Sequence, residues 1–432
     1  MKVWFDVSGI YDWQGSFTGI QRIVHNLAVE LNGSDQEAGF FIYESGGFSE
    51  ISFTVLDQRL KLLRSYDIKD DEELYKKKMS FSKIQHHTVT LLKDTVRNTR
   101  AEPVLRHTYV NSRGLYRSLK NMKNKTRQNN LFNSEDTIIV VDGNWQFNGY
   151  AEALGIAKSK NKFKLVHFVH DLAAIRNPAL ASPGAKKIIT EYFTKVFAFS
   201  DLLITISEST KRDTEWFIKE YAIRHTPIIK TLRIGDNIST DLVAPIKPKE
   251  NLPEEYILAV STIEIRKNYL SLYYAYKLAF EQSILMPKLI IVGKKGWMAE
   301  EVYALLTKDT DIKSQVTIMH GVSDEELEWL YRNCTFTVFP SFYEGWGLPI
   351  AESLSHGKCC ISSNTSSMPE VGKELVIYVS PYDIGSILEE IVRLTDKNIR
   401  TQMEQKIKDG YVATTWEDTF SELKPWLTIY KK

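Results

Sequence analysis

TFTVFPSFYEGWGLPIAESLSHG (residues 335–357) has the pattern of a buried strand, a glycine-rich loop and a helix. Its first six residues are mostly apolar or β-branched, as in a strand that is covered on both faces. Pro349 suits the first turn of a helix, where its missing N–H costs nothing, and Gly357 suits the residue that ends one. We therefore expect Glu344 on the loop and Glu352 one turn into the helix.

Runs of the same kind recur along the chain and alternate with helical patterns. We expect strands at residues 2–7, 40–44, 137–142, 164–170, 202–206 and 228–233, and then at 256–261, 288–293, 315–321, 335–340, 358–363 and 375–380. The predicted fold class is α/β, with two doubly wound Rossmann-like domains in series. Because such sheets bind ligands outside the carboxyl ends of their strands, the substrates should lie in a central cleft between the domains.

The length and a proline-rich stretch predict where the domains divide. At about 100–200 residues per domain, a chain of 432 residues should form two or three domains. Residues 240–256 contain three prolines and little periodicity, which is typical of a linker. We expect an N-terminal domain at 1–243 and a C-terminal domain at 244–413.

Charge and cysteine content exclude several classes of protein. The 55 Lys and Arg against 54 Asp and Glu give a net charge of +1, which does not indicate a nucleic-acid partner. Cys334, Cys359 and Cys360 lie in or beside apolar runs and are expected to be buried free thiols. With no export signal and no apolar segment of about 20 residues, we expect a cytoplasmic protein, either soluble or peripheral on a membrane.

A basic segment interrupts the first half of the chain, within an insertion at about residues 60–131. Residues 76–127 hold fourteen Lys and Arg side chains but only Asp94 and Glu102 as acids. This segment is either a solvated helical insertion or a surface that docks on anionic lipid headgroups or a lipid-diphosphate acceptor. RNA binding is disfavoured because few aromatic residues are interleaved with the charges.

The glycine-rich loop at the start of the predicted helix indicates a phosphate site. Backbone N–H groups at a helix N-terminus attract phosphate, and here they belong to Gly345, Trp346, Gly347 and Leu348. A carboxylate one turn into the helix, Glu352, can accept hydrogen bonds from a ribose diol. Glu344 is then left for the sugar of a nucleotide sugar. Two other interpretations are the acid pair of a glycoside hydrolase, which does not explain the loop, and a purely structural turn.

Several stretches together resemble one enzyme family. EGWGLPIAESLSHG (344–357) resembles the Glu-x7-Glu signature of the family 4 retaining glycosyltransferases, which have the two-domain B-type fold and include enzymes of bacterial polysaccharide and O-antigen synthesis. The resemblance extends over most of the chain, through FTGIQRIVHNLAVEL, HFVHDL, DLLITISEST, STIEIRKNY, LIIVGKKGW and HGVSDEELEWLYRNC. These stretches are specific for the family and much less specific for the sugar.

The resemblance implies that the N-terminal domain at 1–243 binds the acceptor and the C-terminal domain at 244–413 binds the nucleotide sugar. It also implies roles for individual residues. It assigns Glu344 to a hydroxyl of the donor sugar, Glu352 to the ribose and Lys267 to the diphosphate. Many members have an additional arginine where this chain has Ser261, and Arg266 is the candidate to replace it. His170, at a strand end, matches the histidine that approaches the donor sugar at the reacting centre. We therefore predict His170 and Glu344 as catalytic residues.

The remaining site predictions are weaker. Gly19 corresponds to a loop that borders the donor phosphate, and Asp142, Trp145 and Asp171 follow strand ends where they could touch the acceptor or pack in the core. The segment 414–432 should form a helix that crosses back to the first domain.

No metal site is predicted from the acidic or histidine residues. Asp309 and Asp311 form an Asp-x-Asp pattern, but they lie in a polar connection before a strand and so away from the carboxyl edge of the sheet. His167 and His170, three residues apart on a strand, point to opposite faces and cannot share a metal ion. The resemblance likewise implies an enzyme that needs no metal and no other cofactor.

The resulting hypothesis is a retaining, metal-independent hexosyltransferase. It would move a sugar from a nucleotide-diphosphate sugar to a hydroxyl of a growing, lipid-linked bacterial glycan, with GDP-mannose as the first choice of donor and UDP- or dTDP-sugars as alternatives. Two rivals are a non-catalytic membrane-associated scaffold of the same fold, and a nucleotide-sugar epimerase or hydrolase.

Overall fold

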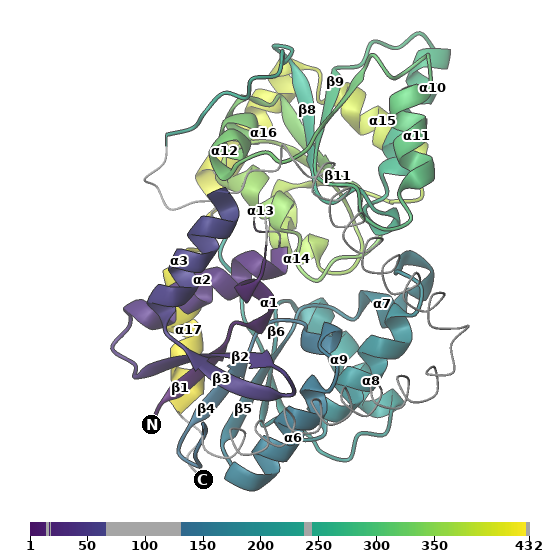
Figure 1. Cartoon of the computed structure of the whole chain (residues 1–432). Helices are drawn as coiled ribbons and strands as arrows, with labels where there is room; N and C mark the ends of the chain where they lie inside the picture. The colour runs from purple at the N-terminus through teal and green to yellow at the C-terminus, as the bar shows by residue number, and fades with distance from the viewer. Residues whose placement is uncertain (14–16, 18, 66–130, 237–243, 429–432) are drawn as a thin grey trace, which may run out of the picture.

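The computed structural model describes residues 1–13, 17, 19–65, 131–236 and 244–428. The chain forms two α/β units, one built around each of two sheets (Figure 1). Most of the predicted basic insertion, including residues 76–127, lies outside the described residues.

The N-terminal sheet has seven strands in the order β3-β2-β1-β4-β5-β6-β7. The strands are β1 (Val3–Asp6), β2 (Ala38–Glu44), β3 (Gly47–Ile51), β4 (Thr137–Val140), β5 (Lys164–Val169), β6 (Leu202–Thr205) and β7 (Ile228–Thr231). All six expected strands are confirmed, and their neighbours pair in parallel. The prediction missed β3, which pairs antiparallel with β2. The two turn residues, Ser45 and Gly46, both have positive φ angles (52° and 83°), as a tight hairpin requires.

The C-terminal sheet has six parallel strands in the order β10-β9-β8-β11-β12-β13. They are β8 (Tyr256–Val260), β9 (Lys288–Val292), β10 (Val316–Met319), β11 (Phe336–Phe339), β12 (Cys360–Ser363) and β13 (Ile377–Val379), and each lies within an expected run. In both sheets the strand order reverses beside the first strand of the unit. That switch point is where doubly wound sheets place their ligands, next to β4 in one unit and β11 in the other.

Helices cover both faces of each sheet. In the N-terminal unit they are α1 (Ser8–Tyr11), α2 (Gly19–Gly33), α3 (Phe53–Ser65), α6 (Tyr150–Asn161), α7 (Ala173–Arg176), α8 (Ala185–Phe197) and α9 (Glu208–Glu220), with short 3-10 turns η2 (Asn144–Gln146) and η3 (Pro178–Leu180). In the C-terminal unit they are α10 (Tyr269–Glu281), α11 (Glu300–Lys308), α12 (Asp324–Asn333), α13 (Leu348–Ser355), α14 (Met368–Gly372), α15 (Ile384–Arg393) and α16 (Lys397–Gly410), with 3-10 turns η4 (Ile265–Lys267) and η5 (Lys373–Leu375). Neighbouring strand residues such as Ile138 and Ile139 are buried in different cores, because successive side chains alternate between faces.

The last helix, α17 (Trp416–Thr428), packs on the N-terminal unit beside α2 (Figure 1). Trp416, Phe420 and Leu423 are buried there. The Lys164 ammonium on β5 donates to the Trp426 carbonyl at 2.7 Å. The chain therefore crosses between the two units twice, after β7 and before α17.

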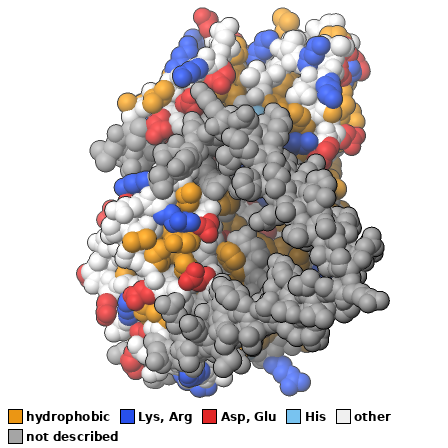
Figure 2. All heavy atoms as spheres, in the orientation of Figure 1, with side chains coloured by type: hydrophobic (Ala, Val, Ile, Leu, Met, Phe, Trp, Pro, Cys, Tyr) orange, Lys and Arg blue, Asp and Glu red, His pale blue; other side chains and the backbone are white. Residues whose placement is uncertain are grey.

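Charge is mixed on the described surface. On the face in Figure 2, acidic and basic side chains are interspersed over both units. This distribution agrees with the net charge of +1 for the whole chain. Charge that serves a function must therefore be sought locally, in the cleft.

Candidate active site

The loop after β11 brings Glu344 to two basic side chains. Lys267 Nζ lies 2.7 Å from Glu344 Oε1, and Arg266 Nη1 lies 2.8 Å from Oε2. Both cations come from η4, which follows β8, the strand next to β11. Adjacent parallel strands end at the same edge of a sheet, so these short loops meet. The structure thus brings three predicted site residues together, and Arg266 is not a solvent-exposed side chain.

A fourth member of this cluster, Glu264, was missed by the sequence analysis. Its carboxylate lies 3.0 Å from Arg266 Nη2 and is 2% exposed. Burial raises the pKa of Glu264 to about 7, although the positive charges of Arg266 and Lys267 act to lower it. Burial would also raise the pKa of Glu344, but the same two cations outweigh it and lower that pKa to about 2. Near neutral pH Glu344 is therefore charged and Glu264 is partly protonated, while burial lowers the pKa of the neighbouring Lys267.

The backbone beyond Glu344 has unused hydrogen-bond donors. None of the described residues accepts a hydrogen bond from the N–H groups of Gly345, Trp346, Gly347 or Leu348. Gly347 has a φ of +121°, which side-chain-bearing residues rarely adopt, and it directly precedes α13. Leu348 and Pro349 open that helix, as the sequence predicted. A free helix N-terminus beside two cations is a favourable place for a phosphate group.

Gly345 lies against the backbone of the N-terminal unit. A Cβ on Gly345 would lie 2.0 Å from the carbonyl oxygen of His170, which follows β5 in the N-terminal unit. At Gly345 the space that a side chain would need is therefore occupied by the backbone of the other unit. Asp171 lies at the same contact and adds to the raised pKa of Arg266, together with Glu344.

The His170 ring is fixed in one orientation. Its Nε2 lies 2.5 Å from the Val141 carbonyl oxygen. Nε2 therefore carries the hydrogen and donates a hydrogen bond to this oxygen. Its Nδ1 is buried and has no hydrogen-bond partner among the described residues. Burial lowers the pKa of His170, which keeps the imidazole neutral at physiological pH. Nδ1 is therefore available as a hydrogen-bond acceptor.

Glu352 is not an open ribose acceptor in this structure. Arg22 of α2, in the other unit, donates to Glu352 Oε1, and the Tyr331 hydroxyl donates to Oε2 at 2.7 Å. Only 2% of Glu352 is exposed. A ribose diol can reach this carboxylate only after Arg22 moves or the two units separate here.

The sequence does not mark Arg22 as a site residue, and the reason is physical. The apolar stripe of α2 places Ile20, Ile23, Val24, Leu27 and Leu31 on one face, and Arg22 lies on the opposite face, which the pattern predicts to be solvated. That face instead packs on the C-terminal unit, and Arg22 is 9% exposed. Contacts between units leave no periodic signal in a sequence.

Further contacts close the cleft. The Glu370 carboxylate on α14 accepts hydrogen bonds from the Glu208 and Ser209 N–H groups at the start of α9, both at 2.7 Å. The Tyr343 hydroxyl, beside Glu344, donates to Asp213 on α9. The structure is therefore a closed arrangement of the two units.

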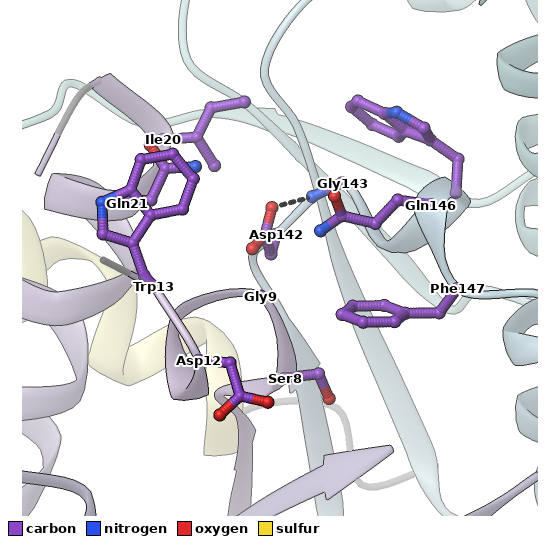
Figure 3. A pocket seen from close by; sticks show the side chains of 11 residues that line it. Ser8, Gly9, Asp12, Trp13, Ile20, Gln21, Asp142, Gly143, Gln146 and Phe147 are labelled. Carbon is purple, nitrogen blue, oxygen red and sulfur yellow. Dashed lines mark hydrogen bonds between the residues drawn. The ribbon is translucent and has the colours of Figure 1, made fainter. Parts of the chain in front are cut away.

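The weaker predictions have different outcomes. Asp142 and Trp145 line a pocket of about 390 Å³ at the carboxyl end of β4 (Figure 3). Asp171 accepts the Ala173 N–H at 2.9 Å and so caps α7 rather than facing open space. Gly19 begins α2, and among the described residues nothing beyond its own helix and its chain neighbours lies within 4 Å of where its Cβ would be. The structure thus groups Asp142 with Trp145 and leaves Gly19 without a defined contact.

The acidic and histidine residues that were considered as metal ligands interact with other side chains. Lys277 pairs with both Asp309 and Asp311, and the Tyr273 hydroxyl donates to Asp309 at 2.7 Å. The His167 Nε2 is hydrogen bonded to the Tyr192 hydroxyl at 2.8 Å. Within the described residues, no group of three or more His, Cys, Asp or Glu side chains is arranged to hold a metal ion.

The chain is similar to a known protein family and to several curated proteins. Residues 244–410 match the family model "Glycosyl transferases group 1". The chain is 28% identical over 233 residues to the O-antigen chain mannosyltransferase B of Escherichia coli, covering 52% of this chain and 59% of that protein. It is 27% identical to the serotype-specific mannosyltransferase WbdA of E. coli, covering 63% of this chain and 34% of that one. The chain thus spans less than two thirds of the length of each of these curated relatives.

A solved structure matches nearly the whole chain. The sucrose-phosphate synthase of Thermosynechococcus elongatus superposes with a TM-score of 0.61 at 16% identity, covering 98% of both chains. This likeness confirms the predicted two-domain B-type fold. No helix in the described parts of the chain is long and apolar enough to cross a membrane.

Proposed function

We propose that this chain, whose residues 244–410 match the family model "Glycosyl transferases group 1", is a retaining, metal-independent hexosyltransferase. The observation that carries the proposal is the Glu344 carboxylate held between Arg266 and Lys267 at the N-terminus of α13. GDP-mannose is the proposed donor, because the curated relatives are named as mannosyltransferases. The proposed acceptor is a bacterial glycan of the O-antigen type, and the proposed location is the cytoplasmic side of the inner membrane.

Each part of the cluster has a task in this reaction. Lys267, Arg266 and the free N–H groups of residues 345–348 bind the diphosphate and stabilise the charge that develops on it as it leaves, which is the work of a metal ion in other enzymes. Glu344 accepts a hydrogen bond from a hydroxyl of the donor sugar. We assign no side chain as a nucleophile. The leaving diphosphate takes the proton of the acceptor hydroxyl on the same face of the sugar, and this retains the configuration.

Donor binding requires the cleft to open at Glu352. The ribose diol replaces Arg22 as the hydrogen-bonding partner of this carboxylate, while the Tyr331 hydroxyl holds its other oxygen at 2.7 Å. The closed structure is therefore the state before the donor enters.

A nucleotide panel tests this site. The panel contains GDP, UDP, dTDP, ADP and CMP, each tested in the presence of EDTA. We expect GDP to raise the thermal midpoint of the protein more than the other nucleotides do. At a hundredfold excess over Kd the stabilisation should be about 2.7 kcal/mol. Lys267→Met should abolish it, whereas Lys277→Met, remote from the cluster, should not. If no nucleotide stabilises the protein, the donor site is wrong and the scaffold hypothesis gains support.

Glu264 should make donor binding depend on pH. Its pKa of about 7 means that the carboxyl is mostly neutral at pH 6 and mostly charged at pH 8. The extra negative charge opposes the diphosphate, so the Kd for GDP-mannose should rise about five- to tenfold from pH 6 to pH 8. Titration calorimetry at both pH values measures this change. In Glu264→Gln the dependence should disappear, and an equally steep dependence in that variant would exclude Glu264 as its source.

A further inference from the structure

The start of α14 has the sequence pattern of a helix cap, but its side chains bond elsewhere. Residues 367–370, SMPE, follow the Ser-x-x-Glu pattern in which the two polar side chains bond each other's backbone N–H and close the helix. Ser367 directly precedes α14, yet within this described helix its hydroxyl bonds no backbone N–H. The Glu370 carboxylate bonds α9 of the other unit. Both side chains are therefore used outside their own helix.

The Ser367 hydroxyl bonds the loop that follows β11. Its oxygen lies 2.9 Å from the Glu344 carbonyl oxygen and 2.7 Å from the Trp346 carbonyl oxygen, and it donates to both. Within the described residues, no other donor bonds these two carbonyl oxygens. Because Ser367 is fully buried, the two carbonyl groups depend on this one hydroxyl for their hydrogen bonds.

Ser366 bonds the N–H group of Glu344. Its hydroxyl oxygen accepts this N–H at 2.8 Å. Ser366 has a φ of 50°, in the left-handed region where residues other than glycine are strained. The backbone of Glu344 is therefore held at both its N–H and its carbonyl by two adjacent serine hydroxyls.

The two bonds of Ser367 set the direction of two N–H groups in the loop. In a planar trans peptide group, the C=O and the N–H point in opposite directions. The Glu344 carbonyl shares its peptide group with the Gly345 N–H, and the Trp346 carbonyl shares its peptide group with the Gly347 N–H. Because both carbonyls point toward Ser367, both glycine N–H groups point away from it. These are two of the N–H groups that bond no described residue.

We propose that Ser367 is a positioning residue of the donor site, whose hydroxyl turns the Gly345 and Gly347 N–H groups toward the terminal phosphate of the nucleoside diphosphate. Backbone N–H groups that converge in this way form an anion-binding concavity. The inference rests on the proposed function and adds to the donor site a residue that touches no substrate. Without the hydroxyl, two buried carbonyls lose their donor, and the peptide groups rotate toward other donors. The N–H groups then no longer converge on the phosphate.

Paired titrations with a nucleoside diphosphate and its monophosphate test this role. Calorimetry on the full chain, with EDTA, uses GDP and GMP, or the corresponding pair if the nucleotide panel favours another base. The wild type should bind GDP at least tenfold more tightly than GMP. Ser367→Ala should weaken GDP binding about tenfold, the size expected for hydrogen bonds to a charged group, and change GMP binding less than twofold.

Two further variants separate positioning from stability. Ser366→Gly removes the hydroxyl that accepts the Glu344 N–H, and glycine adopts a φ of 50° without strain, so this variant should remain folded. Its preference for GDP over GMP should fall severalfold. Ser362→Ala is the matched control, because Ser362 is also fully buried and its hydroxyl donates to the Phe339 carbonyl at 3.3 Å, outside the loop. This control should bind both nucleotides as the wild type does.

The outcomes separate this inference from the donor site. If the wild type prefers GDP and the Ser367→Ala and Ser366→Gly variants keep that preference, the inference is overturned and the donor site stands. An equal loss of GDP and GMP binding in Ser367→Ala would also overturn it, because the hydroxyl would then only stabilise the domain. Equal affinity of the wild type for GDP and GMP would show that these N–H groups bind no terminal phosphate. If the wild type binds neither nucleotide, the proposed function itself fails.

Discussion

Glu344→Gln should lower kcat by about a hundredfold or more, the loss found when one group that stabilises developing charge is removed. The substitution keeps the shape of the side chain and removes the charge that is paired with Arg266 and Lys267 at 2.8 and 2.7 Å. The KM for the donor should change less, by about threefold, because the two cations that bind the diphosphate remain. Initial rates with the donor identified by the nucleotide panel measure both constants.

Glu390→Gln is a matched control for this variant. Glu390 is paired with Arg393 at 2.6 Å on the exposed part of α15, away from the cleft. The kcat of the Glu390→Gln variant should equal that of the wild type. If Glu344→Gln retains more than a third of the wild-type kcat, Glu344 does not take part in the reaction, and the assignment of the cluster fails.

Glu352→Ala should cost both stability and donor affinity. It removes the nearer of the two carboxylates paired with Arg22, a residue that is only 9% exposed in the wild type, and leaves Asp324 Oδ1 at 4.0 Å from the guanidinium. Breaking a buried ion pair from one side costs about 3–5 kcal/mol. We therefore expect a loss of this size in the free energy of unfolding, measured by chemical denaturation, together with at least tenfold weaker binding of GDP.

A double variant separates the two effects. Arg22→Met/Glu352→Gln removes both charges, and the glutamine can still accept the Tyr331 hydroxyl, so most of the lost stability should return. The affinity for GDP should stay low, because the carboxylate for the ribose is absent. Wild-type GDP affinity in the double variant would show that Glu352 serves only to join the two units.

The sequence predicted the fold well because most of its strands are buried; among the twelve predicted strands, β7 and β10 are more exposed. Twelve runs of apolar and β-branched residues became twelve parallel strands, since a strand covered on both faces has a continuous pattern. The edge strand β3 was missed: its sequence, GFSEI, is short and mixed in polarity. The loop and helix at 341–355 were also predictable, because Pro349 and the glycines have local conformational requirements.

The candidate site was predicted only where its residues lie within a motif. Glu344, Arg266 and Lys267 belong to two such stretches, and the structure brings them together. Glu264 belongs to one of these stretches as well, but no local rule marks a carboxylate whose importance comes from burial. Arg22 was invisible because its partner, Glu352, lies 330 residues away in the other unit. Spacing along the chain carries no information about such pairs.

The most direct test of the proposed activity is a transfer assay with NMR analysis of the product. The protein is incubated with GDP-α-mannose, EDTA and a panel of methyl α-glycosides as acceptors, and the anomeric configuration of the new linkage is determined. The account predicts an α-linked mannosyl product and release of GDP, with the product absent in Glu344→Gln. A β-linked product, or consumption of the donor at the same rate without any acceptor, would contradict a retaining glycosyltransferase.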